Sequence, residues 1–159
     1  MDEAVARSIA RWPNVPAVYG WLALDRRGNW LIRSAAGTRF ERIANRALRE
    51  FIGRNYEADA QGRWFFQNGP QRVYVRLAYT PLVVRHEGDA LLDQCDRPFA
   101  PGRFFLDEEG SLLAEGAGTV ALLDDRDLAR YADSAERLPV MAAAELPARF
   151  GFQSDPRPG

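Results

Sequence analysis

The densest group of side chains that could do chemistry surrounds the only histidine, in the stretch "RHEGDALLDQCD". His86 could act as a base that deprotonates Cys95, because an imidazole beside a thiol creates a nucleophilic thiolate. His86 could instead bind a metal ion together with the carboxylates Asp89 and Asp93. The stretch lacks the local signature of a cysteine hydrolase and the spacing of a metal centre, and a strand end followed by an acidic loop also explains it. His86, Asp89, Asp93 and Cys95 therefore form an alternative site, and we expect no metal ion and no cofactor.

A second pattern occurs three times, as Asp-x-x-Gly in "LALDRRGNWLI", "YEADAQGRWFF" and "FFLDEEGSLLA". A calcium loop needs more alternating oxygen ligands, and a phosphate loop needs a Gly-x4-Gly-Lys-Ser/Thr motif that this chain lacks. A type I turn followed by a bulge favours Asp at its first position and Gly at its fourth. The pattern therefore predicts three hairpin corners, at Asp25/Gly28, Asp59/Gly62 and Asp107/Gly110.

All 21 basic residues are arginines. Four of them recur at helical spacing, and three more lie with a tyrosine on strand-like segments. Such a surface could hold anions or an acidic partner, although an amphipathic helix also exposes charges to water on one face. The predicted binding surface consists of Arg39, Arg42, Arg46, Arg49, Arg63, Arg72, Tyr74 and Arg76.

Charge is distributed unevenly along the chain. Residues 1–80 contain 13 arginines and 7 acidic residues, a net charge of +6, whereas residues 81–159 contain 8 and 15, a net charge of −7. Such a split favours an acidic protein surface as partner, or self-association, which could produce a homodimer. An isoelectric point near 5.9 argues against nucleic-acid binding.

Length and composition fit one domain over residues 1–159, with 47% hydrophobic residues to build a core. No run of 18 apolar residues is present, so we expect no membrane span. The acidic start "MDEAVARSIARW" is not typical of an export signal, and a single cysteine excludes an internal disulfide. We therefore expect a cytoplasmic protein.

Helical periodicity is clearest over residues 39–52, where Thr38 and Glu41 match a capping box. A short helix is expected at 3–12, before Pro13. Acidic residues from Asp124 onward predict the start of a late second helix, and the tail 153–159 is expected to fray.

Period-two alternation dominates the remainder of the chain, with a turn signal at Asn68-Gly69 between two strand-like segments. We expect an α+β fold: antiparallel hairpins and a meander of about five to seven strands, with the amphipathic helix 39–52 packed on one sheet face and a late second helix.

Three segments, "WLALDRRGNWLIR", "FIGRNY" and "GRWFFQNGPQRVYV", resemble a family of uncharacterised, mostly proteobacterial proteins filed as a domain of unknown function. The resemblance covers residues 21–85. It implies no activity and transfers no functional residue.

Together these observations favour a non-enzymatic binding or regulatory module of the cytoplasm that uses the arginine and aromatic surface. Two alternatives stay open. One is a small hydrolase or metal-dependent enzyme centred on His86, and the other is a structural subunit of a larger assembly.

Overall fold

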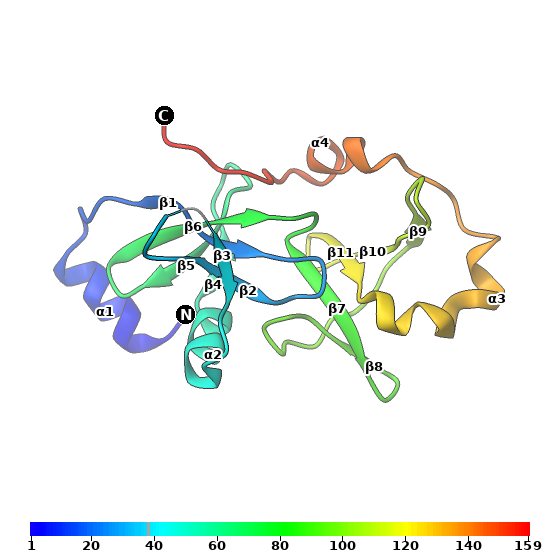
Figure 1. Ribbon diagram of the computed structural model, residues 1–159, viewed down its shortest axis with the longest axis horizontal. Coiled ribbons are helices and arrows are strands. Elements are labelled where there is room, and N and C mark those ends of the chain that lie inside the picture. The colour runs from blue at the N-terminus through cyan, green and yellow to red at the C-terminus, as the bar shows by residue number, and fades with distance from the viewer. Residues whose placement is uncertain (38) are drawn as a thin grey trace. The chain divides into compact units, whose positions relative to one another are not determined.

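The structure is a computed structural model that describes residues 1–37 and 39–159 (Figure 1). The chain divides into two units. Unit 1 comprises Met1–Asp25, Asn29–Ala78 and Gln153–Gly159, and unit 2 comprises Arg26–Gly28 and Tyr79–Phe152. Each unit has its own sheet and its own core, and the two are described separately below. That the whole chain behaves as one domain stays a prediction.

Unit 1 is built on a six-stranded sheet with the strand order β3-β2-β1-β6-β5-β4. Its neighbouring strands are antiparallel except for β1 and β6, which run parallel. A bulge that contains Gly20, with φ +76°, interrupts the pairing of β1 with β6. The strands are β1 (Val18–Leu24), β2 (Trp30–Arg33), β3 (Phe40–Arg42), β4 (Tyr56–Ala58), β5 (Trp64–Asn68) and β6 (Gln71–Leu77).

Two helices belong to unit 1, and the second corrects a prediction. Helix α1 spans Glu3–Arg11, and helix α2 spans Arg46–Arg54, not 39–52. Residues 40–42 instead form β3, because Phe40 pairs with Arg33 of β2. Asn45 then caps α2 through its side-chain oxygen, which accepts a hydrogen bond from the Leu48 amide. The capping box predicted at Thr38 lies outside the described residues.

The core of unit 1 lies between α2 and one face of the sheet. Trp30, Tyr56 and Ile52 are each at most 2% exposed, and the Trp30 and Tyr56 rings meet edge to face at 4.9 Å. Phe51 of α2 packs edge to face on Phe66 of β5. The amphipathic helix therefore packs on the sheet as predicted, although over different residues.

Unit 2 contains a five-stranded sheet with the order β8-β7-β11-β10-β9. Here too one pair is parallel, β7 with β11, and the other pairs are antiparallel. All five residues of β11, "TVALL", are buried, which fits a central strand rich in apolar residues. The strands are β7 (Leu82–Glu87), β8 (Ala90–Leu92), β9 (Phe104–Leu106), β10 (Leu112–Gly116) and β11 (Thr119–Leu123).

The helices of unit 2 are short. A 3-10 helix, η1 (Asp125–Tyr131), leads into α3 (Ala132–Ala135) and forms the late helix. A second 3-10 turn, η2 (Ala143–Glu145), precedes α4 (Leu146–Phe150). The α+β class is confirmed, with two mostly antiparallel sheets in place of one meander.

After α4 the chain returns to unit 1. The Gln153 amide donates to the Gly62 carbonyl, and the Ser154 carbonyl accepts from the Leu77 amide at 2.7 Å. The fraying expected for 153–159 is a dynamic property and stays a prediction. Within residues 1–37 and 39–159, no helix has the length and apolar character needed to cross a membrane.

Candidate functional site

The three Asp-x-x-Gly stretches form turns, as predicted. In the clearest case Asp59 Oδ1 accepts hydrogen bonds from the Gln61 and Arg63 amides, and the Gly62 amide donates to the Asp59 carbonyl. The glycine at the fourth position has a positive φ in each turn, which a side chain rarely tolerates. The aspartates therefore hold local backbone, and no group of three possible metal ligands occurs in the described part of the chain.

A fourth corner of the same construction was not predicted. Asp93 Oδ1 accepts from the Cys95 and Arg97 amides, and Asp96 takes the positive-φ position with φ +60°. Asp can adopt this conformation without being glycine, so a search for Asp-x-x-Asp would have found the turn. Burial raises the pKa of the Asp93 carboxyl above its ordinary value. Asp93, part of the alternative site, thus serves a turn.

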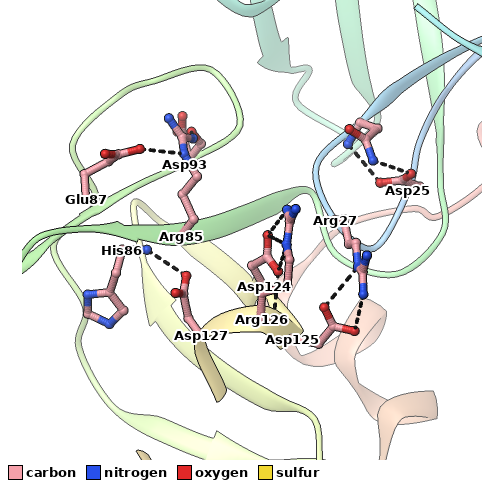
Figure 2. A network of polar contacts seen from close by, with 11 residues as sticks. Asp25, Arg27, Arg85, His86, Glu87, Asp93, Asp124, Asp125, Arg126 and Asp127 are labelled. Carbon is pink, nitrogen blue, oxygen red and sulfur yellow. Dashed lines mark hydrogen bonds and ion pairs between the residues drawn. The ribbon is translucent and has the colours of Figure 1, made fainter. Parts of the chain in front are cut away.

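His86 lies on β7, and its ring faces a partner that the sequence did not suggest. Its Nε2 is 2.7 Å from the Tyr131 hydroxyl, while its backbone amide donates to Asp127 (Figure 2). Among the described residues, no hydrogen bond joins the His86 ring to Asp89, Asp93 or Cys95. The structure therefore does not assemble these residues around the imidazole.

Cys95 lies half-buried next to the same turn. Burial, with a contribution from the neighbouring Asp93 charge, raises the pKa of the Cys95 thiol above its ordinary value. A thiol of this kind stays protonated near neutral pH, whereas a nucleophilic cysteine requires the thiolate. The hydrolase interpretation gains no support from this geometry and stays a prediction.

The acidic residues at the start of η1 act as helix caps and ion-pair partners. The buried Asp124 accepts hydrogen bonds from the Arg126 amide and guanidinium, and this pairing lowers the pKa of the Asp124 carboxyl. Asp125 pairs with Arg27 through both of its oxygens (Figure 2). These carboxylates are already engaged by arginines of the same unit, which confirms the capping interpretation for Asp124.

The predicted arginine stripe is not one helix face. Arg39 precedes β3 and Arg42 lies within it, so only Arg46 and Arg49 belong to α2. Arg46 pairs with Glu50 at 2.9 Å across one helical turn. Pairing of β3 with β2 therefore separates residues that a single long helix would have aligned.

The other half of the predicted surface does assemble, on strands β5 and β6 and the turn before them. The Arg72 guanidinium lies 3.9 Å from the centre of the Phe65 ring, and the Arg63 guanidinium lies 4.6 Å from that of Tyr74. The Tyr74 hydroxyl donates to Asp59 at 3.0 Å, and Arg63 donates to the same carboxylate at 2.8 Å. Arg76, further along β6, is exposed.

The sheet keeps this cluster apart from α2. Phe65 pairs with Tyr74, whereas the next residues, Phe66 and Val73, pair on the opposite face, toward α2. The eight residues of the predicted surface therefore do not form one continuous site.

An apolar groove lies on the α2 side of the unit 1 sheet. It has a volume of about 390 Å³, and its floor consists of buried residues such as Leu22, Ile52 and Phe66. Its rim is formed by Trp21, Ile32 and Leu48, which are 47%, 44% and 39% exposed. The remaining lining residues are Val18, Ile43, Asn68, Gln71 and Val73.

Sequence reasoning missed this groove. Its rim residues come from β1, β2 and α2, and nothing in their spacing places them together. One usable signal was present, because the segments around Trp21 and Ile32 are apolar at successive positions and not only at alternate ones, which indicates apolar side chains on both faces of these strands.

The comparison with protein families matches residues 1–157 to DUF2944, described as "Protein of unknown function (DUF2946)". The chain belongs to this family. The resemblance noted for residues 21–85 to a domain of unknown function is thus confirmed and extends over nearly the whole DUF2944 chain. No curated protein matches the sequence.

Two solved bacterial structures resemble the DUF2944 chain. A DUF1285 family protein from Silicibacter pomeroyi DSS-3 is 18% identical, with a TM-score of 0.53 over 84% of this chain and 78% of that one. A DUF1285 family protein from Shewanella baltica OS155 is 11% identical, with a TM-score of 0.49 over 70% of this chain and 90% of that one. The first of these likenesses shows a shared fold.

Proposed function

We propose that this protein is a non-enzymatic binding module of the cytoplasm, whose unit 1 groove receives an amphipathic helix of a partner protein. One observation carries the proposal. The described residues expose six large apolar side chains, and three of them, Trp21, Ile32 and Leu48, line this one groove. Exposed apolar side chains scattered singly need no explanation, but a cluster around a concave site is typical of a binding surface.

The groove favours a helix over an extended segment. Its walls are side chains of α2 and of a sheet face, so it offers few backbone groups for pairing. An extended peptide laid there would leave its own amides and carbonyls without partners, whereas a helix satisfies them internally. Apolar residues at helical spacing would fill the space between Leu48 and Trp21.

Charge supports an acidic partner. Unit 1 carries 12 arginines and 8 acidic residues, a net charge of +4. Arg46 and Arg54 are paired with Glu50 and Asp2. Arg39, before β3, and Arg49 of α2 make no ion pair with a described residue. Acidic residues flanking the apolar face of the partner helix would meet these charges.

The experiment uses designed peptides and fluorescence anisotropy with the full chain. The probe is a labelled amphipathic helix with a leucine and phenylalanine face and glutamate flanks. Matched peptides carry lysine flanks or a face of serine. We expect binding of the acidic peptide alone, with affinity that falls as salt rises.

Two protein variants locate the binding. Leu48→Glu should weaken binding by about tenfold or more, because it places a charge on the apolar rim. Val140→Glu is the matched control, since Val140 is 64% exposed on unit 2, and it should leave the affinity unchanged. Equal effects of the two substitutions, or equal binding of all three peptides, would refute the proposal.

Self-association is the other source of an acidic partner, because unit 2 carries 9 arginines and 14 acidic residues, a net charge of −5. Sedimentation at several concentrations tests this possibility directly. A dimer that dissociates in the Leu48→Glu variant would make a second copy the occupant of the groove.

A further inference from the structure

Two of the Asp-x-x-Gly corners have charged residues at both middle positions, and both corners contribute to one pocket of unit 2. The middle residues are Arg26 and Arg27 in the first corner and Glu108 and Glu109 in the other. Arg26 and Arg27 belong to unit 2, although the strands on either side of them do not. Both arginines and Glu109 line the pocket, which has a volume of about 290 Å³.

The floor of the pocket is apolar. It consists of Leu112 of β10 with Leu122 and Leu123 of β11, each at most 4% exposed, and Leu128 of η1 completes the lining. On the scale at which a cavity of about 150 Å³ holds benzene, this pocket accommodates about twelve non-hydrogen atoms. It is therefore large enough for an aliphatic side chain that carries small polar groups.

Four charged residues line the pocket, and two of them neutralise each other. Arg27 donates to both carboxylate oxygens of Asp125, at 3.0 and 3.2 Å (Figure 2). Arg26 and Glu109 make no ion pair with a described residue. One cation and one carboxylate therefore stay available to a ligand.

Arg26 is held by contacts that leave most of its donors available. Its guanidinium carbon lies 4.6 Å from the centre of the Tyr79 ring, and the Tyr79 hydroxyl donates to Asp107 at 2.8 Å. Arg26 Nη2 donates to Ser111 Oγ at 2.9 Å. The Ser111 hydroxyl keeps its own O–H for an incoming acceptor, as the guanidinium keeps most of its N–H groups. Arg26 and Ser111 together therefore suit a carboxylate.

Glu109 is the acidic side chain of its corner that holds no backbone. Asp107 accepts hydrogen bonds from the Glu109 and Ser111 amides. Glu108 accepts from the Ala143 amide at 2.7 Å. The Glu109 carboxylate is exposed and can accept hydrogen bonds from an ammonium group.

We propose that this pocket binds a small aliphatic α-amino acid such as leucine. The ligand carboxylate lies on Arg26 and the Ser111 hydroxyl, its ammonium lies on Glu109, and its side chain packs on the leucines. A zwitterion matches one unpaired cation and one unpaired carboxylate, whereas a simple carboxylic acid leaves Glu109 without a partner and an amine leaves Arg26 without one. The proposal concerns unit 2 and does not depend on the groove of unit 1.

The test titrates the full chain with four probes and follows its amide signals by NMR. L-Leucine is compared with isocaproate, which lacks the ammonium, and with isoamylamine, which lacks the carboxylate. L-Alanine, the fourth probe, lacks the long aliphatic side chain. We expect L-leucine to shift the amide signals of Ser111 and Leu123 and to bind about tenfold more tightly than each of the other probes.

Two variants assign the two charges. Arg26→Gln should bind L-leucine and isoamylamine about equally, because the ligand carboxylate has lost its partner. Glu109→Gln should bind L-leucine and isocaproate about equally, because the ammonium has lost its own. Arg103→Gln is the matched control, since Arg103 of unit 2 is exposed and pairs with Glu115, and it should leave the affinity for L-leucine unchanged. Circular dichroism and thermal melting verify that each variant is folded.

Several results would overturn the proposal: no signal shift with millimolar L-leucine, equal affinity for L-leucine, isocaproate and isoamylamine, or equal losses in Arg26→Gln and Arg103→Gln. The comparison of probes needs no variant, so it decides the question even if Arg26→Gln does not fold. Leu48→Glu should leave L-leucine binding unchanged, so the pocket of unit 2 and the groove of unit 1 fail separately.

Discussion

Replacing Asp59 with alanine tests whether the corner aspartates stabilise the fold through their side-chain hydrogen bonds. The Asp59 carboxylate accepts from the Gln61 and Arg63 amides, from Arg63 Nε and from the Tyr74 hydroxyl, at 2.8 to 3.0 Å. The side chains of Asp59 and Arg63 are 10% and 21% exposed, so water replaces these contacts only in part. Burial alone would raise the pKa of the Asp59 carboxyl, but these hydrogen bonds outweigh it and leave the pKa below its ordinary value.

The expected loss of stability in Asp59→Ala follows from the four hydrogen bonds that the Asp59 carboxylate accepts. Each is worth about 0.5–1.5 kcal/mol, and water recovers part of the two amide bonds at the turn surface. Asp59→Ala should therefore lower the free energy of unfolding of unit 1 by about 3 kcal/mol. Glu50→Ala is the matched control, since Glu50 also pairs with an arginine four residues away but is 47% exposed. Glu50→Ala should lower the free energy of unfolding by about 0.5 kcal/mol at most.

Urea unfolding followed by tryptophan emission is the assay, because all four tryptophans belong to unit 1. The midpoint should shift for Asp59→Ala with little change in the slope. If Asp59→Ala cost no more than Glu50→Ala, the corner hydrogen bonds would contribute little, and the account of these turns would be wrong.

Three further predictions follow from turns and burial. Because the pKa of Asp59 is lower in the folded protein than in the unfolded chain, its carboxylate stabilises the fold fully at pH values above the unfolded pKa. This stabilisation is lost as the pH falls through the folded pKa. The free energy of unfolding of Asp59→Asn, measured between about pH 5 and pH 2, should therefore depend less on pH than that of the natural protein. Gly110→Ala, at φ +84° in open space, should lower the free energy of unfolding by about 1 kcal/mol. Gly116→Ala should lower it clearly more, because the new Cβ would lie 2.5 Å from a phenylalanine ring. Thermal melting compares the two variants, and equal losses of stability would contradict this geometry. The thiol of Cys95 should react with a disulfide reagent at pH 8 many times more slowly in the folded chain than in urea, since burial raises its pKa; equal rates would contradict this.

Short-range features were predictable from the sequence because their causes are short-range. An Asp-x-x-Gly corner involves five consecutive residues, and the Asp59 and Asp107 turns use the contacts that their sequence suggested. The capping role of Asp124 is equally local. Composition and alternation were enough to place the fold in the α+β class.

Features that depend on distant segments were not predictable. The start of α2 was misplaced because Phe40 belongs to a strand, and that strand exists only through its pairing with Arg33. The rim of the groove needs Trp21, Ile32 and Leu48 to meet from three elements. Periodicity within one segment holds no information about such pairing, so the arginine stripe seemed continuous in sequence and is divided in the structure.

The route of the chain has a consequence for synthesis. Unit 1 uses residues at the beginning of the sequence and again after Phe152, where Gln153 and Ser154 hydrogen-bond to Gly62 and Leu77. A ribosome releases these last residues only after every residue of unit 2 has been made. Unit 1 must therefore wait, with part of its sheet lacking these hydrogen bonds, while the segment Tyr79–Phe152 of unit 2 is translated.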